Sequence, residues 1–299
     1  MNKKADVVIV GTGVAGLFSA LNLPDDKEII MITKADAQSS DSFLAQGGIC
    51  VLRDEQDYDS YFEDTMRAGH YENRKESVDI MIRSSGKIIE DLVGYGVEFE
   101  KDGEAFAYTR EGAHSRPRIL FHADVTGKEI TSKLLARVRE KNNVTIYEYT
   151  TMTDILEENG KCAGITVKTK SGEESSIYAD YTILASGGIG GLYQHSTNFP
   201  HLTGDALEVA KKHHIRLEHL DYVQIHPTTL YSEKPGRRFL ISESVRGEGA
   251  LLYNKNMERF VDELLPRDVV TRGNPGNRWK RMERILCGCP WRRSRKRRY

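Results

Sequence analysis

The sequence is poor in the residues that build disulfide-rich scaffolds, and it has no long apolar run. Its 299 residues include four cysteines and two tryptophans. The cysteines, Cys50, Cys162, Cys287 and Cys289, show no pairing with histidines at metal-ligand spacing, so we predict neither a zinc site nor a disulfide framework. No apolar segment reaches the ~20 residues of a membrane-spanning helix. These absences favour a soluble protein of a reduced compartment, the cytoplasm, without a membrane partner.

Charge is unevenly distributed along the chain, although the formal net charge is only −1. Residues 273–299 contain ten Lys or Arg and one acidic residue, which gives this tail a charge of +9. Residues 1–272 contain 33 basic and 43 acidic residues and therefore carry −10. With 39% hydrophobic residues, this acidic body can bury the core of one large domain or two ordinary ones.

The most informative stretch is a predicted strand, turn and helix near the start of the chain. After Asp6, an apolar run over residues 7–10 leads into Gly11, Gly13 and Gly16, which are spaced G-x-G-x-x-G, and then into an amphipathic helix. In this context Gly11 permits a tight turn, Gly13 lets the backbone approach a pyrophosphate, and Gly16 lets helix and strand pack closely. The competing interpretation is a secretory signal peptide, but Asp6 and the three glycines fit it poorly.

The next strand departs from the pattern of a plain NAD-dependent dehydrogenase. Residues 28–33 are too apolar to alternate, which predicts a parallel strand buried on both faces. In the common dinucleotide-binding unit such a strand ends with an acidic residue that binds the ribose hydroxyls. Here the strand is followed by Lys34, so a dehydrogenase of that type is disfavoured.

Further along, the pattern predicts helices and then a group of strands. Apolar positions at helical spacing predict amphipathic helices over residues 75–93 and around residues 130–138. Residues 144–149, 164–168 and 174–178 are expected to form antiparallel strands, separated by turns at residues 159–160 and 171–172. A second glycine-tipped strand follows at residues 181–191. Two such strands in one chain indicate a site for one extended dinucleotide.

Over residues 5–272 the chain resembles the flavoprotein family of succinate dehydrogenase, fumarate reductase and L-aspartate oxidase. The resemblance rests on motifs that occur in the family's order: V-I-V-G-T-G-V-A-G-L, S-F-L-A-Q-G-G-I, T-R-E-G-A-H-S, H-A-D-V-T-G, A-S-G-G-I-G, T-G-D-A, Q-I-H-P-T-T-L, S-E-S-V-R-G-E-G-A and L-P-R-D-V-V. It implies an α/β fold, in which a Rossmann-like FAD-binding domain carries an inserted α+β substrate-capping domain that is incomplete here. We expect the FAD-binding domain over residues 1–219, the start of the capping domain over residues 220–272, and an aberrant basic tail over residues 273–299.

Within that family the chain is most similar to the members that oxidise L-aspartate. The resemblance implies FAD-dependent conversion of aspartate to iminoaspartate for NAD biosynthesis, with oxygen or fumarate as electron acceptor and quinolinate synthase downstream. Covalent members attach FAD to a histidine four residues before the alanine of A-Q-G-G, and Asp41 stands in that place, so non-covalent FAD is expected. A fumarate reductase or succinate dehydrogenase type of flavoprotein, and an inactive fragment, remain alternatives.

The resemblance also assigns the residues of the flavin site. They are the glycine-rich turn, a lysine near the phosphates, a small-residue loop around the ring system and an acidic residue: Gly11, Thr12, Gly13, Val14, Ala15, Gly16, Lys34, Asp41, Ser42, Phe43, Leu44, Ala45, Gln46, Gly47, Gly48 and Asp205. The positive end of the first helix suits a pyrophosphate, and small residues leave the backbone open to a cofactor.

The substrate site is assigned in the same way. The family pattern places catalytic roles on Arg267, His226 and Glu111, and substrate binding on Gln224, Ser242, Glu243 and Arg246. Arginine suits a dicarboxylate because its fork binds carboxylates in a bidentate manner. In the family's aspartate oxidases a glutamate faces the substrate amino group, the role implied for Glu111. Taken alone, each residue could be structural, for example Arg267 as a helix-start arginine after Pro266.

The sequence changes character after residue 272. A predicted helix from residue 266 meets a Gly- and Pro-rich stretch at residues 273–277, and the resemblance to the family ends there. We expect residues 273–299 to come from a shifted reading frame and to pack poorly, which makes the chain a truncated family member. The alternative is a basic nucleic-acid-binding arm, since this tail combines aromatic residues with positive charge. An arm would follow a completed domain, so no nucleic-acid partner is expected.

Overall fold

The computed structural model describes residues 2–254, 256–273 and 286–288. Its helices are α1 Val14–Asn22, α2 Asp41–Leu44, α3 Tyr58–Ala68, α4 Lys75–Gly94, α5 Thr126–Glu140, α6 Asp205–Lys212, α7 Glu243–Gly247 and α8 Arg267–Gly273, with short 3-10 turns η1 Glu55–Asp57 and η2 Gly190–Leu192. Its strands are β1 Lys3–Val10, β2 Ile29–Ile32, β3 Gly48–Cys50, β4 Lys101–Asp102, β5 Ala105–Phe106, β6 Ile119–Phe121, β7 Val144–Tyr147, β8 Thr150–Glu158, β9 Lys161–Thr169, β10 Glu174–Leu184, β11 Leu251–Tyr253 and β12 Leu286–Gly288.

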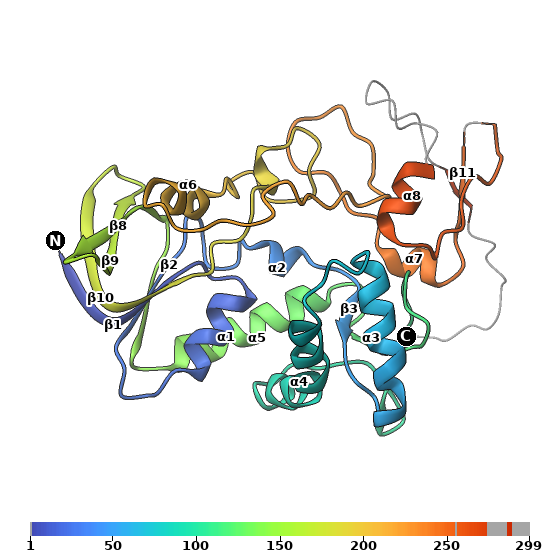
Figure 1. Ribbon diagram of the computed structural model, residues 1–299, viewed down its shortest axis with the longest axis horizontal. Coiled ribbons are helices and arrows are strands. Elements are labelled where there is room, and N and C mark those ends of the chain that lie inside the picture. The colour runs from blue at the N-terminus through green and yellow to red at the C-terminus, as the bar shows by residue number, and fades with distance from the viewer. Residues whose placement is uncertain (1, 255, 274–285, 289–299) are drawn as a thin grey trace, which may run out of the picture.

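A mixed sheet at one end of the molecule forms the base of the fold (Figure 1). Within the described residues its six strands run in the order β7-β2-β1-β10-β9-β8. β1 pairs in parallel with β2 and β10, whereas β9 is antiparallel to β10 and to β8. At the opposite end of the view lie α7, α8 and β11.

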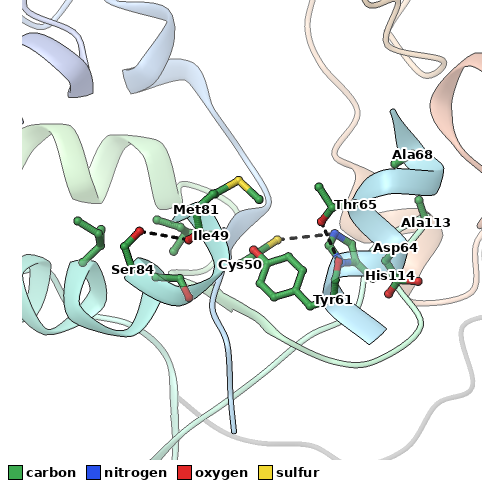
Figure 2. Close-up of a pocket in the computed structure, with 12 residues that line it drawn as sticks. Ile49, Cys50, Tyr61, Asp64, Thr65, Ala68, Met81, Ser84, Ala113 and His114 are labelled. Atoms are coloured by element: carbon green, nitrogen blue, oxygen red, sulfur yellow. Dashed lines mark hydrogen bonds between the residues drawn. The ribbon is translucent and has the colours of Figure 1, made fainter. Parts of the chain in front are cut away.

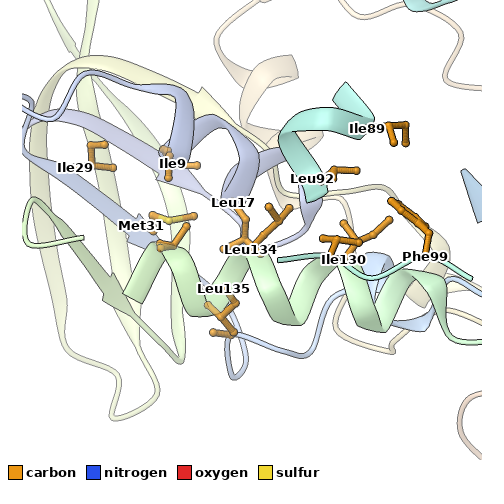
Figure 3. Close-up of a cluster of buried hydrophobic side chains, with 14 of the residues drawn as sticks. Ile9, Leu17, Ile29, Met31, Ile89, Leu92, Phe99, Ile130, Leu134 and Leu135 are labelled. Atoms are coloured by element: carbon orange, nitrogen blue, oxygen red, sulfur yellow. The ribbon is translucent and has the colours of Figure 1, made fainter. Parts of the chain in front are cut away.

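The two faces of β1 are both buried, as the continuous apolar run predicts. On one face Val7 and Ile9 pack with Leu17 of α1 and with Leu134 and Val138 of α5. Figure 3 shows this cluster, in which α5 lies along the sheet beneath α1. On the other face of the sheet the buried residues of β1 and β2 join those of β8–β10 and α6: Val8, Val10, Ile30, Ile32, Met152, Ile165, Ile177, Ala206 and Val209.

Several expectations about the strands are corrected. Residues 144–147 form β7, which is parallel to β2 at the edge of the sheet and is not part of the antiparallel group. Residues 174–178 and 181–184 belong to one continuous strand, β10. β8 was not predicted, and it supplies the missing partner of β9. The two predicted turns are confirmed, since they join β8 to β9 and β9 to β10, with positive φ at Asn159, Gly160 and Gly172.

The expectation for the tail falls mostly outside the described residues. Residues 274–285 and 289–299 are not described, so the predicted poor packing is not addressed there. Residues 286–288 form β12, an antiparallel partner of β11 that the sequence analysis did not predict. The helix expected from residue 266 is confirmed as α8.

Gly11 occupies the point where three strands converge. Its N–H donates to Ile32 O at 2.9 Å, and Ala185 N, just after β10, donates to Val10 O at 2.9 Å. Its φ is +114°, and a Cβ at this position would lie 2.3 Å from Ala185 O. Gly16 is equally tight, because its Cβ would lie 2.1 Å from Gly11 O. Both predicted roles, the tight turn and the close helix packing, are confirmed.

Gly11→Ala is therefore expected to destabilise the protein by about 3 kcal/mol or more, since backbone strain and a backbone clash add together. Gly86→Ala is the matched control, because a Cβ there, inside α4, meets nothing within 4 Å. That change is expected to stabilise by about 0.5–1 kcal/mol. Urea denaturation of the two variants measures the difference. Equal midpoints would contradict the packing described for Gly11.

Candidate functional site

A cavity of about 270 Å³ lies where β1, β2 and β10 end. Its lining includes the glycine-rich turn, the end of β2, the start of α2 and the start of α6. Of the predicted flavin-binding residues, those that line it are Gly11, Thr12, Gly13, Val14, Ala15, Lys34, Asp41, Ser42 and Asp205. The carboxyl ends of parallel strands are the usual place for a dinucleotide in such a sheet. Thr203 of the T-G-D-A motif lines the same cavity, as do Thr150 and His201, for which the sequence predicted no role.

The start of α1 is arranged as an anion-binding end. Gly13 precedes the helix without a side-chain cap, and the N–H of Val14 donates to Ser42 Oγ at 3.1 Å. Ser42 comes from α2, which is itself capped by Ser40, whose hydroxyl accepts from Phe43 N at 3.3 Å. The positive end of the α1 dipole and a hydroxyl therefore face one opening, which suits a pyrophosphate.

Lys34 and Asp205 form an ion pair across the cavity. The Lys34 ammonium donates to Asp205 Oδ2 at 2.8 Å and to Thr203 Oγ1 at 2.7 Å. Both charged side chains are one-third exposed. The pair links the end of β2 to the first residue of α6, so the two residues that the sequence analysis named separately act together.

Asp41, the first residue of α2, is held by residues 198–199, which follow β10 in the chain. Its carboxylate accepts hydrogen bonds from the side-chain amide of Asn198 and from Phe199 N, the latter at 3.0 Å. Asp41 stands where the covalent members of the family carry the histidine that bonds to FAD, and an aspartate has no imidazole to form that bond. Its carboxylate instead holds residues 198–199 in place.

The remaining loop residues lead away from this cavity towards a second cluster. β3 continues the loop and pairs with β6, whose first residue, Ile119, also bridges Thr109. The loop of residues 39–48 and the loop of residues 109–118 are thereby brought side by side. They meet at Gly47, which has a φ of +55° and whose Cβ would lie 2.4 Å from Glu111 Oε1.

Glu111 lies at this meeting point with an unused oxygen. Glu111 Oε1 and Gln46 Oε1 are both buried without a hydrogen-bond partner among the described residues. Burial, reinforced by the nearby charge of Glu243, raises the pKa of Glu111 to about 7, although Arg267 and Arg246 act in the opposite direction. A buried carboxylate with a free acceptor is costly unless a donor or a cation meets it.

Two arginines converge on Glu243, the first residue of α7. Arg267 Nε, at the start of α8, donates to Glu243 Oε2 at 2.6 Å, and its Nη1 donates to Gln224 Oε1 at 2.7 Å. Arg246 Nη2 lies 3.3 Å from the same Glu243 oxygen. The structure therefore brings together four of the predicted substrate and catalytic residues, from three separate segments.

Arg246 has hydrogen-bonding capacity left over. It is 2% exposed, and its Nη1 donates to Glu263 O at 2.6 Å. Its Nε and Nη2 are buried without a hydrogen-bond partner among the described residues. Since guanidinium groups prefer bidentate carboxylate acceptors, these donors favour an anionic ligand.

His226 and Ser242 lie near this cluster, and each side chain pairs with a residue two positions later in the sequence. His226 Nδ1 lies 2.9 Å from Thr228 O, and burial together with the charge of Arg267 lowers its pKa to about 4. The ring is therefore neutral near pH 7. The hydroxyl of Ser242, which is 3% exposed, lies 2.7 Å from that of Ser244.

The fold and the first cavity define a dinucleotide-binding protein, in which a second cluster of charged side chains is formed by Glu111, Glu243, Arg246 and Arg267. A family model described as an FAD binding domain matches residues 6–278, and the chain belongs to this family. The donors, the glycine turn and the open helix end fit the diphosphate of such a cofactor.

Curated relatives are similar over most of this chain. The L-aspartate oxidase of Clostridium perfringens (strain 13 / Type A) is 49% identical over 273 residues, which are 91% of this chain and 62% of the relative. The L-aspartate oxidase of Clostridium acetobutylicum is 46% identical over 90% of this chain and 62% of the relative. The chain thus spans about three-fifths of the length of these relatives.

Solved structures give the same fold. A mutant of E. coli quinol fumarate reductase superposes with a TM-score of 0.84 at 26% identity, covering 91% of this chain and 50% of the other. A flavocytochrome c3 fumarate reductase in an open conformation gives a TM-score of 0.75 at 25% identity, over 91% of this chain and 50% of that one. The α/β FAD-binding fold expected from the sequence is confirmed.

Proposed function

We propose that this chain carries the FAD site and much of the substrate site of an enzyme that oxidises L-aspartate to iminoaspartate. The observation that carries the proposal is a set of buried groups that make no hydrogen bond among the described residues: Nε and Nη2 of Arg246, of which Nη2 is ion-paired with Glu243, and Oε1 of Glu111. Carboxylates match the arginines, and an ammonium matches Glu111. Aspartate has both groups on adjacent carbons. The name shared by the curated relatives supports the same substrate.

Each residue has a role in this proposal. Arg246 and Arg267 bind the carboxylates, and Glu243 and Gln224 hold Arg267 in place through Nε and Nη1. His226, neutral near pH 7, and Ser242 contribute hydrogen bonds to a carboxylate. Glu111 orients the amino group, with Gly47 leaving room for its carboxyl. Arg267 occupies the family's position for proton exchange, but as a guanidinium it is a poor base, and its main contribution is electrostatic.

The reaction requires the substrate to lose a hydride from Cα and a proton from nitrogen, so that the C–N bond becomes C=N. FAD, held non-covalently, supplies the two-electron acceptor, and oxygen or fumarate is the proposed final acceptor. The chain's own residues hold the substrate so that its Cα faces the hydride acceptor. Positioning of this kind accounts for much of the rate enhancement in such transfers.

A fumarate reductase or succinate dehydrogenase type of activity is the second candidate, since the superposed structures are of that type. The discriminating feature is Glu111, because a dicarboxylate without an amine offers nothing to its buried oxygen.

We also propose that residues 1–219 form the FAD-binding domain and that residues 220–272 begin a capping domain. Among the described residues no helix has the length and apolarity to cross a membrane. A cytoplasmic location and quinolinate synthase as the downstream partner are part of the proposal.

The test is an anaerobic visible spectrum of the FAD-loaded chain before and after L-aspartate is added, with succinate as the control. We expect a yellow protein that L-aspartate bleaches and succinate does not. Bleaching by succinate alone would favour the second candidate. A protein that takes up no FAD would contradict the cofactor proposal for this chain.

A further inference from the structure

The loop that carries Glu111 is closed at its base but free of regular structure above it. Thr109 and Ile119 exchange backbone hydrogen bonds, Thr109 N to Ile119 O at 2.9 Å and Ile119 N to Thr109 O at 3.2 Å. Residues 110–118 between them contain neither helix nor strand, and Ala113 has a φ of +67°. Above the base, Ala113 N donates to Leu264 O at 2.9 Å and His114 N donates to Glu111 O at 3.4 Å. These few backbone bonds leave room for side-chain contacts to help fix the position of Glu111.

A buried ion cluster lies on the far side of this loop. Arg118, with an exposed fraction of 0%, donates through Nε and Nη2 to both oxygens of Asp57, at 3.0 and 2.9 Å. Its Nη1 donates to Asp64 Oδ2 at 2.7 Å. Burial by itself would raise the pKa of both aspartates, but the hydrogen bonds from Arg118 and from nearby hydroxyls outweigh it and keep each pKa below its ordinary value. Both carboxylates are therefore charged and are strong acceptors.

Asp64 extends this cluster to the loop through Ser115. The N–H and the hydroxyl of Ser115 both donate to Asp64 Oδ2, each at 2.7 Å. Ser115 lies four residues after Glu111. Charge-assisted bonds of this kind are stronger than neutral ones, so α3 holds the loop at a defined position.

Apolar packing does not hold the loop on this side, because a cavity of about 450 Å³ lies beside it. Ala113 and His114 line it, together with Cys50, Tyr61 and Asp64 (Figure 2). His114 Nε2 lies 3.6 Å from Cys50 Sγ across it, and its Nδ1 faces Arg118 at 3.2 Å. With space on that side, the polar contacts carry the restraint.

We propose that Ser115 and Asp64, backed by Arg118 and Asp57, are positioning residues that hold Glu111 against Gly47 and so set the preference for a ligand with an amino group. None of them touches the ligand itself. The inference rests on the proposed function, in which Glu111 meets the substrate ammonium. It adds that the amine preference depends on a cluster formed by η1, α3 and the end of the loop.

Ser115→Ala tests this with little risk to folding, since it removes one hydroxyl and leaves the Ser115 N–H bond to Asp64. Anaerobic equilibrium dialysis with labelled L-aspartate and labelled succinate, each in excess over the flavin, measures the ratio of the two dissociation constants. We expect L-aspartate binding to weaken about 5- to 10-fold and succinate binding to change less than about 2-fold, because one charge-assisted bond is lost. Ser115→Thr, which keeps the hydroxyl, is expected to restore the wild-type ratio.

The control is Ser85→Ala, which removes a hydroxyl that is buried beside the same cavity. Ser85 Oγ accepts from Leu52 N at 2.9 Å and donates to Ile82 O at 2.6 Å, and neither partner belongs to the Glu111 loop. A merely structural role predicts that both alanine variants lower the urea midpoint and leave the ligand ratio unchanged. That result would overturn the inference while leaving the proposed function intact. Wild-type chain that binds no L-aspartate would contradict the proposed function, and with it the inference.

Discussion

Glu111→Gln is expected to weaken L-aspartate binding about 10- to 100-fold, since a charge-assisted hydrogen bond in a buried site is lost. Succinate binding is expected to stay equal or improve, because a buried negative charge beside a dianion is removed. Dissociation constants for both ligands, measured at pH 8, give the result. Glu174→Gln is the matched control, since that side chain is 70% exposed and pairs with Lys168 on the surface. Equal losses for both ligands would show that Glu111 does not recognise an amine.

The same residue predicts a pH dependence. The groups around Glu111 are Glu243 and Asp124, which raise its pKa, and Arg267 and Arg246, which lower it. With a pKa of about 7, the carboxyl is neutral at pH 6 and charged at pH 8. L-aspartate should therefore bind more tightly as the pH rises through 7, and succinate less tightly. Neither trend should remain in Glu111→Gln.

The free energy of unfolding should fall as the pH rises, whereas the affinity for L-aspartate should increase. The folded pKa of Glu111 lies above the ordinary value of 4.5, so the folded state holds a proton that the unfolded chain releases. The wild type therefore loses stability as the pH rises from 4.5 to about 7, and the loss levels off above that range. Denaturation midpoints of Glu111→Gln minus those of the wild type should grow over the same interval. A constant difference would place the pKa of Glu111 near its ordinary value.

The parts of the fold that the sequence predicted well are those fixed by neighbouring residues. The strand-turn-helix at Gly11 has its apolar run, its glycines and its helix within 17 residues, and α4 and α5 each show their own periodicity. The orientation of β7 was not predictable in this way. Its apolar pattern suits any buried strand, and only its pairing with β2, over 100 residues earlier, makes it parallel.

The candidate site shows the same division. Glu111, Glu243, Arg246 and Arg267 could be named from motifs, but their convergence depends on pairings between distant segments, such as β3 with β6. The buried position of Arg118 was not predicted, because Arg118 ends a polar, charged loop of a kind that is usually exposed to solvent. The signal that could have indicated its burial is its place directly before the apolar residues of β6. A charge next to a buried strand needs a partner, and Asp57 and Asp64 provide it.

Arg267→Lys is expected to lower turnover about 100-fold or more while changing aspartate affinity far less. The guanidinium reaches Glu243 through Nε and Gln224 through Nη1, which fixes its plane. A lysine ammonium is a point charge on a flexible stem and cannot hold both partners in that geometry. A misplaced cation still attracts a carboxylate, but it no longer stabilises the charge that develops in the transition state, and one such donor is worth about 10²–10³ in rate.

The measurement is anaerobic single-turnover flavin reduction by L-aspartate at saturating and limiting concentrations, with variants matched for FAD content. Arg272→Lys is the control on the same helix, since that side chain is 75% exposed and pairs with Asp268 at 2.7 Å. It should reduce flavin at the wild-type rate. If Arg267→Lys weakened affinity and left the limiting rate unchanged, Arg267 would be a binding residue, and the electrostatic role at the reacting carbon would have to pass to Arg246. Because Arg246 Nε and Nη2 make no hydrogen bond among the described residues, changing both Arg246 and Arg267 to lysine would then cause the larger loss of rate.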